Sequence, residues 1–128
     1  MSIYGIGTDR VVIARIASSL ERFEDRFICR VYTEEEIEQA RAKGNVARRL
    51  AMLFAAKEAV SKALGTGFRH GITMRDIETI HQSSGKPEIK LHGVAAKLAA
   101  EMGITTVHLS LTDDDGIAMA FAIAELGH

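Results

Sequence analysis

The chain has 128 residues, which is enough for one domain with a hydrophobic core and too few for two. Apolar residues make up 47% of it and charged residues 26%, the composition of a globular domain rather than of a disordered chain. The formal net charge of -1 excludes a general attraction to a polyanion such as nucleic acid, so an electrostatic partner must bind a local patch.

Three features of the sequence predict a soluble, cytoplasmic protein. Cys29 is the only cysteine, so no disulfide can form within the chain, and a lone cysteine suits a reducing compartment. The first ten residues, "MSIYGIGTDR", lack the basic and apolar segments of a signal peptide. No run approaches the ~20 apolar residues that a membrane-spanning helix needs, so we expect no membrane partner.

Residues 3–9, "IYGIGTD", form an apolar run with two glycines and predict a strand that ends at Asp9. A carboxylate at a strand end, behind a glycine-rich run, is a common position for a metal or phosphate site. The alternative is that Asp9 caps the helix that "DRVVIARI" begins. The residues alone leave both interpretations open.

The next segment predicts an amphipathic helix, since apolar residues recur every three or four positions from Ile13 to Phe27. Arg15, Arg22 and Arg26 are spaced by seven and four and form a second stripe on roughly the opposite face. Such a row is usually no more than a solvated face. Because this stripe is nearly of one sign in a protein of net charge -1, it favours an acidic protein as partner over nucleic acid.

Two more helices are predicted after this one. Thr33 and Glu36 fit a capping box at the start of a short helix that ends at Gly44. The long helix is predicted from about Asn45 to Leu64.

Charged residues interrupt the alanine-rich stretch 54–68, "FAAKEAVSKALGTGF", at Lys57, Glu58 and Lys62. Charged side chains are rarely fully buried unless they are paired. Glu58 and Lys62 stand four apart, in the order that favours a surface ion pair on a helix, and this is the plainest interpretation. If Asp9 lies nearby, Asp9 and Glu58 instead provide two hard oxygen ligands that suit Mg²⁺.

The second half of the chain predicts short, adjacent elements. "GTG" at 65–67 is typical of a helix end, with a phosphate cradle of backbone N–H groups as the alternative. The order of elements, βαααββαββ, predicts an α+β fold. We expect a single domain over 1–128, with a small, mostly antiparallel sheet packed on the long central helix and shorter helices. Its remaining elements are a β-hairpin around Gly85 and Lys86, a helix over 93–103, and two strands within 105–126 joined by an acidic turn at 113–116.

The sequence resembles the holo-acyl-carrier-protein synthases, the small phosphopantetheinyl transferases of bacterial fatty-acid synthesis. The resemblance rests on "GIGTDRVVIARI" at 5–16 and "FAAKEAVSKALGTGF" at 54–68. The segments "DIE", "GKP" and "VHLSLTDDDGIAMA" follow in the order of the family. The match covers nearly the whole chain, and the first two motifs together are specific.

The resemblance implies a magnesium-dependent transfer of 4′-phosphopantetheine from coenzyme A to a serine of apo acyl carrier protein. It implies that Asp9 and Glu58 hold Mg²⁺ against the diphosphate of coenzyme A and that Lys62 lies near the transferring phosphate. The base that activates the serine is left open, with Glu58, acting through a water, as one candidate. The resemblance also implies a homotrimer with active sites between subunits. Contacts with coenzyme A are implied for Lys62, Gly65, Thr66, Gly67, Lys86, Pro87 and Asp113, and contacts with the carrier for Arg15, Arg22 and Arg26.

The sequence departs from the family pattern at two positions. Asp113 stands where many members have histidine, which puts in doubt the role of this position in coenzyme A binding or base catalysis. Leu53 stands where many members have arginine, so a phosphate contact is lost or is replaced, with Arg48 and Arg49 as candidates.

Two other functions compete with the transferase. One is a non-catalytic module that binds coenzyme A or the carrier, and the other is a magnesium-dependent hydrolase of nucleotide diphosphates. The presence of Asp9, Glu58 and Lys62 together disfavours the non-catalytic module.

Overall fold

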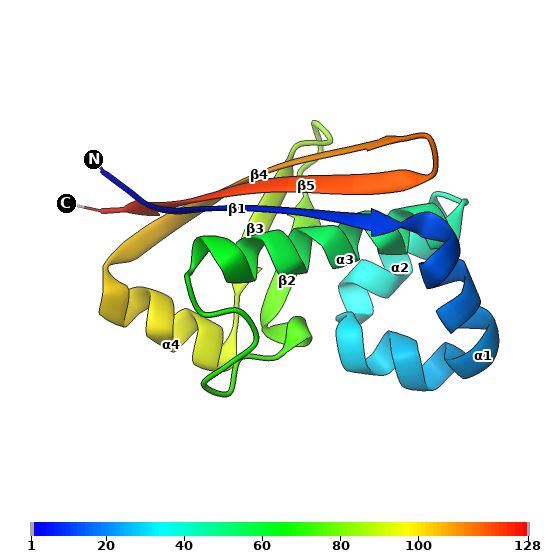
Figure 1. The fold of residues 1–128 in the computed structure, drawn as a ribbon, viewed down its shortest axis with the longest axis horizontal. Helices are drawn as coiled ribbons and strands as arrows, with labels where there is room; N and C mark the ends of the chain where they lie inside the picture. The colour runs from blue at the N-terminus through cyan, green and yellow to red at the C-terminus, as the bar shows by residue number, and fades with distance from the viewer. Residues whose placement is uncertain (1, 128) are drawn as a thin grey trace.

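A computed structural model describes residues 2–127 and places one long helix, α3, along a three-stranded sheet (Figure 1). Helices α1 and α2 gather at one end of α3, and α4 lies at the other end, where the two termini also meet (Figure 1). The elements in chain order are β1 (Ser2–Val12), α1 (Ile13–Val31), α2 (Glu34–Ala42), α3 (Val46–Ala63), the 3₁₀ helix η1 (Met74–Asp76), β2 (Ile77–His81), β3 (Pro87–Leu91), α4 (Gly93–Met102), β4 (Ile104–Asp114) and β5 (Ile117–Leu126).

The predicted α+β fold and its order of elements are confirmed. The main sheet has the strand order β1-β5-β4, and both of its pairings are antiparallel. Strands β2 and β3 form a separate antiparallel hairpin, which contacts β4. Among residues 2–127, no helix is long and apolar enough to cross a membrane.

The inner face of β5 consists of alanines, which explains why a strand so rich in alanine forms here. Side chains alternate between the two faces of a strand. From Ala118 to Ala124, every second residue of β5 is a fully buried alanine that faces the core around α3, while the residues between them face outward. Small side chains on this face let α3 lie close to the sheet. The alanines are Ala118, Ala120, Ala122 and Ala124.

Glycines bring β1 even closer to α3. A Cβ atom added at Gly7 would overlap the carbonyl oxygen of Ala59, and one added at Gly5 would overlap that of Ala63. The two backbones are therefore in direct contact, with no side chain between them.

The predicted end of the first strand is wrong. Pairing with β5 continues as far as Val12, which lies opposite Ile117, so Asp9 lies inside the strand opposite Ala120. The alternative role of Asp9 as a helix cap is also wrong, because Val12 is the N-cap of α1. The ladder extends this far because β5 begins directly after the β4–β5 turn and offers a partner for each of these residues.

Most predicted helix ends are confirmed, whereas the regular arginine stripe is not. Thr33 and Glu36 form the predicted capping box, and Asn45 is the N-cap of α3. Helix α1 is kinked at Glu24, which has non-helical φ and ψ angles of 14° and -96°. The kink falls between Arg22 and Arg26, so the three arginines, although all exposed, do not lie along one straight helix face.

The contact between β1 and α3 predicts a large effect of one methyl group. In Gly7→Ala the added Cβ forces β1 and α3 apart, and we expect the free energy of unfolding to fall by about 3 kcal/mol or more. Gly116→Ala is the control. Gly116 has φ +77°, and a Cβ added there would meet no atom within 4 Å, so the change introduces only backbone strain of about 1 kcal/mol. Urea unfolding followed by circular dichroism measures both. Equal losses would contradict the role of the close contact.

Candidate active site

Asp9 and Lys62 meet at the seam between β1 and α3. The Nζ of Lys62 lies 3.2 Å from Oδ1 of Asp9 and 3.0 Å from the carbonyl oxygen of Thr8. Lys62 therefore pairs across two elements, and the predicted surface pair with Glu58 is wrong. The Lys62 side chain is half exposed and that of Asp9 is mostly covered, so this ion pair lies at the protein surface.

Glu58 belongs to the same cluster, one helical turn before Lys62. Burial raises the pKa of Glu58, the nearby negative charge of Asp9 raises it further, and the positive charge of Lys62 opposes both. The two carboxylates are thus close enough to repel each other, and a cation between them would relieve this repulsion.

The two carboxylates fit a magnesium site in which the protein supplies only some of the ligands. Within residues 2–127 no three His, Cys, Asp or Glu side chains gather as a metal site, so the protein offers two carboxylates, Asp9 and Glu58. Mg²⁺ is commonly held by one or two carboxylates and fills its other positions with water and substrate phosphates.

The "GTG" segment ends α3, as predicted, and is not a phosphate cradle built from backbone N–H groups. The N–H of Gly65 donates to the carbonyl of Lys62, and those of Thr66 and Gly67 donate to that of Ser61, at 3.0 to 3.3 Å. Gly65 and Gly67 have φ angles of +79° and +57°, which favour glycine. All three N–H groups are engaged in the helix end, and the contacts of this segment with coenzyme A stay a prediction.

Lys86 and Pro87 are not brought to Asp9 within one chain. They lie at the β2–β3 hairpin, which contacts β4, and β5 separates β4 from β1 (Figure 1). The single chain therefore assembles only part of the predicted set of residues.

Asp113, at the end of β4, is held by an arginine from the first turn of α3. Arg48 donates from Nη2 to Oδ1 at 2.7 Å and from Nε to Oδ2 at 3.0 Å, a bidentate pair. The hydrogen bonds from Arg48 hold the pKa of Asp113 below its usual range.

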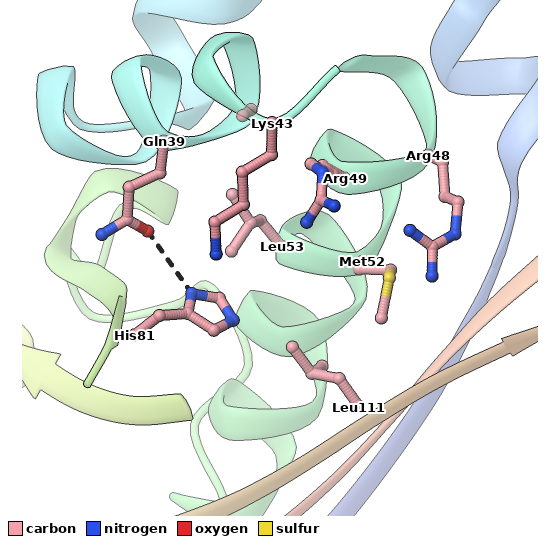
Figure 2. Close-up of a pocket in the computed structure, with 9 residues that line it drawn as sticks. Gln39, Lys43, Arg48, Arg49, Met52, Leu53, His81 and Leu111 are labelled. Carbon is pink, nitrogen blue, oxygen red and sulfur yellow. Dashed lines mark hydrogen bonds between the residues drawn. The ribbon is translucent and has the colours of Figure 1, made fainter. Parts of the chain in front are cut away.

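A positively charged pocket of about 160 Å³ lies between α2, α3, β2 and β4 (Figure 2). Burial lowers the pKa of His81, and the positive charges of Lys43 and Arg49 lower it further. His81 is therefore neutral near pH 7, with Nδ1 3.3 Å from Oε1 of Gln39. The pocket is lined by Gln39, Ala40, Lys43, Arg48, Arg49, Met52, Leu53, His81 and Leu111.

Both candidate replacements for the missing arginine line this pocket beside Leu53. Arg48 is held by Asp113, whereas Arg49 donates from Nε to the carbonyl of Gly44 at 3.1 Å. The replacement of the phosphate contact stays a prediction.

Comparison with known proteins identifies the family. Residues 5–122 match the sequence model of the 4′-phosphopantetheinyl transferase superfamily. The chain belongs to this superfamily.

Related transferases resemble the chain over nearly its full length. The holo-[acyl-carrier-protein] synthase of Halorhodospira halophila is 46% identical over 125 residues, covering 98% of this chain and 99% of the relative. The crystal structure of the holo-[acyl-carrier-protein] synthase from Neisseria meningitidis has a TM-score of 0.90 and 40% identity, covering 97% and 99% of the two chains. That of the Helicobacter pylori synthase, in complex with coenzyme A, has a TM-score of 0.84 and 30% identity, covering 94% and 99%.

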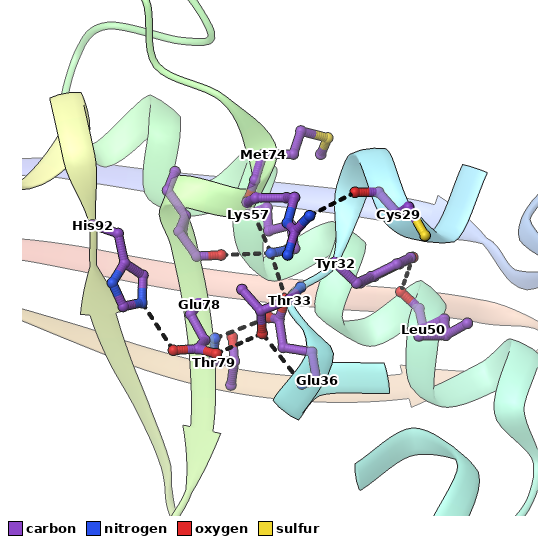
Figure 3. A network of polar contacts seen from close by, with 12 residues as sticks. Cys29, Tyr32, Thr33, Glu36, Leu50, Lys57, Met74, Glu78, Thr79 and His92 are labelled. Atoms are coloured by element: carbon purple, nitrogen blue, oxygen red, sulfur yellow. Dashed lines mark hydrogen bonds and ion pairs between the residues drawn. The ribbon is translucent and has the colours of Figure 1, made fainter. Parts of the chain in front are cut away.

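The most deeply buried charges of this transferase were not predicted from the sequence. Lys57 and Glu36 are fully buried and pair at 2.7 Å (Figure 3). For Glu36 the sequence predicted only the capping box, and for Lys57 it predicted no role. Helical periodicity held the missing signal, because Lys57 is four residues after Leu53 and seven after Leu50, and both leucines are buried.

Charge changes around Glu58 should move its pKa in opposite directions in the metal-free transferase. Asp9→Asn removes a negative charge, so the pKa of Glu58 should fall, and Lys62→Met removes a positive charge, so it should rise. Carbon-13 NMR titration of the Glu58 carboxyl group measures both shifts. Lys97→Met, at an exposed position on α4, should leave the pKa of Glu58 unchanged. If Asp9→Asn leaves the pKa of Glu58 unchanged, the two carboxylates do not share a site.

Proposed function

We propose that this protein is a holo-[acyl-carrier-protein] synthase. It transfers 4′-phosphopantetheine from coenzyme A to a serine of apo acyl carrier protein, releases adenosine 3′,5′-bisphosphate and serves fatty-acid biosynthesis. The observation that carries the proposal is the cluster of Asp9, Glu58 and Lys62 in a chain whose full-length relatives are synthases. The Helicobacter pylori synthase complex with coenzyme A supports coenzyme A as the donor. A cytoplasmic location, where both substrates are expected, is part of this proposal.

The reaction joins the serine oxygen to the β-phosphorus of coenzyme A and breaks the bond from that phosphorus to the bridging oxygen. The serine proton passes to a base, and the bridging oxygen leaves with adenosine 3′,5′-bisphosphate. Such a transfer requires alignment of the reactants and neutralisation of charge on the phosphate oxygens. Lys62, whose exposed ammonium group already binds Asp9, supplies positive charge to these oxygens.

Magnesium dependence follows from the two carboxylates. Asp9 and Glu58 would hold Mg²⁺, and the bound ion would neutralise the diphosphate and the leaving oxygen. Glu58 is our candidate to accept the serine proton through a water molecule, because it lies in the same cluster as Asp9 and Lys62.

We propose that the subunits of a homotrimer share the remaining coenzyme A contacts. In one chain the hairpin with Lys86 and Pro87 lies away from Asp9, which supports an active site between subunits. The residues proposed to contact coenzyme A besides Lys62 are Gly65, Thr66, Gly67, Lys86, Pro87 and Asp113.

The outer face of the main sheet supports this assembly. Ile6, Phe121 and Ile123 are 65%, 47% and 37% exposed, and Ile6 lies directly opposite Ile123 on the neighbouring strand. An apolar patch of this kind is typical of a protein interface. Light scattering should give the mass of three chains, and the mass of one chain would exclude the trimer.

A transfer assay tests the proposed reaction. With coenzyme A and Mg²⁺, apo acyl carrier protein should gain the mass of one phosphopantetheine, and chelation of the metal should prevent this. Asp9→Ala with Glu58→Ala should slow transfer by at least about 100-fold, because both carboxylates proposed to hold Mg²⁺ are lost. The control combines Glu38→Ala and Glu101→Ala, two exposed glutamates on other helices.

Other outcomes of the assay would favour the competing functions. A carrier that binds but stays unmodified would indicate a non-catalytic module. Nucleotide released from coenzyme A without any carrier would indicate a hydrolase.

Arg15, Arg22 and Arg26 are exposed on α1, and we propose that they bind the acidic carrier. Arg15→Glu with Arg22→Glu should weaken carrier binding about tenfold or more and leave coenzyme A binding unchanged. Reversal of Arg41 and Lys97, exposed on α2 and α4, is the matched control. Titration calorimetry at rising salt measures the effect, because exposed charge pairs are screened. Carrier affinity that does not depend on salt would contradict this role.

A further inference from the structure

Lys57 directly precedes Glu58 in α3 and has no part in the proposed chemistry, yet it is fully buried and fully bound (Figure 3). Its Nζ donates to Oε1 of Glu36 at 2.7 Å and to the carbonyl oxygens of Met74 and Ile77 at 2.9 and 2.6 Å. An ammonium group has three N–H donors, and here each has one acceptor at a fixed position. The side chain is therefore held in one orientation.

Glu36 is bound as completely as Lys57. Its Oε1 also accepts from the backbone N–H of Thr33, and its Oε2 accepts from that of Thr79, both at 3.0 Å. The Lys57–Glu36 pair thus ties the middle of α3 to the first turn of α2 and to the start of β2 (Figure 3).

The opposite side of α3 is fixed by its contact with β1 at Gly5 and Gly7. The helix is held between this contact and the Lys57–Glu36 pair. Consecutive side chains on a helix point about 100° apart. Any rotation or shift of α3 that moves Lys57 therefore moves Glu58 as well.

Stability alone gives little reason to keep such a pair. A buried ion pair is often no more stabilising than well-packed apolar side chains of similar volume. The pair instead fixes the position of the Lys57 ammonium group, because its three acceptors come from two different segments of the chain. Asp9 and Glu58 come from different elements, so the distance between them depends on the placement of α3. Mg²⁺ accepts its ligands only at about 2.0–2.1 Å.

We infer that Lys57 is a positioning residue, which fixes the rotation and depth of α3 and so holds Glu58 at the distance from Asp9 that a shared divalent cation requires. The inference rests on the proposed function for the identity of that cation. Lys57 itself touches neither the cation nor the substrates.

The test removes both charges and keeps the volume. Lys57→Met alone would leave Glu36 charged and unpaired inside the protein. We therefore use the double variant Lys57→Met, Glu36→Gln, because glutamine can still form the capping box with Thr33. Calorimetric titration with Mg²⁺ in the presence of coenzyme A should show an affinity at least about tenfold below wild type. Affinity for the carrier, which depends on α1, should be unchanged. Wild-type Mg²⁺ affinity in a folded double variant would overturn the inference.

A second variant separates positioning from general stability. Ile104→Val shortens a buried side chain of the core near α4, away from the Lys57–Glu36 pair, and should leave Mg²⁺ affinity unchanged. Both variants are compared below their unfolding temperatures. An equal loss of Mg²⁺ affinity in Ile104→Val would show that lowered stability suffices and that Lys57 has no specific role.

Amide hydrogen exchange without metal makes the inference independent of the proposed function. In the double variant we expect faster exchange in α3 around Glu58 and in β1 around Asp9, and in Ile104→Val we do not. If the wild-type protein binds no Mg²⁺, the proposed metal site fails, and faster exchange still supports the positioning role. Unchanged exchange overturns that role whatever the metal result.

Discussion

The direct contact between the backbones of α3 and β1 is the constraint on which the rest of the structure depends. Gly5 and Gly7 permit it, and the alanines of β5 continue the same shallow surface across the sheet. With no side chains between helix and strand, a short aspartate on β1 and a lysine on α3 can reach each other at the surface of the seam. The candidate active site is therefore a consequence of close packing at the centre of the domain.

Neighbouring charges on α3 have opposite environments because the helix lies between two layers. Lys57 faces away from the main sheet and is buried with all three donors bound. Glu58 faces the seam with β1, where partial burial and the charge of Asp9 raise its pKa. The negative charge of Glu58 beside Asp9 favours a bound cation, whereas the positive charge of Lys57 is already paired with Glu36. Because consecutive side chains on a helix point about 100° apart, Lys57 is buried against Glu36 while its neighbour Glu58 lies in the candidate active site.

Two features of the single chain agree with the proposed homotrimer. The outer face of the main sheet carries exposed apolar side chains, among them Ile6 and Phe121. The β2–β3 hairpin with Lys86 lies beside β4, on the other side of β5 from Asp9. Active sites shared between subunits, as the resemblance to the synthases implies, would account for both features.

The sequence by itself determined the α+β class, the order of elements, the capping box and the glycine helix ends, because periodicity and capping act within a few residues. It also singled out Asp9, Glu58 and Lys62 as site candidates. Only the tertiary structure decided that Asp9 lies inside a strand, that Lys62 pairs with it rather than with Glu58, and that Lys57 is buried against Glu36. The two ion pairs join residues 21 and 53 positions apart, and the strand pairing joins Asp9 to Ala120 near the other end of the chain. Such pairings depend on how whole elements pack, which no local pattern encodes.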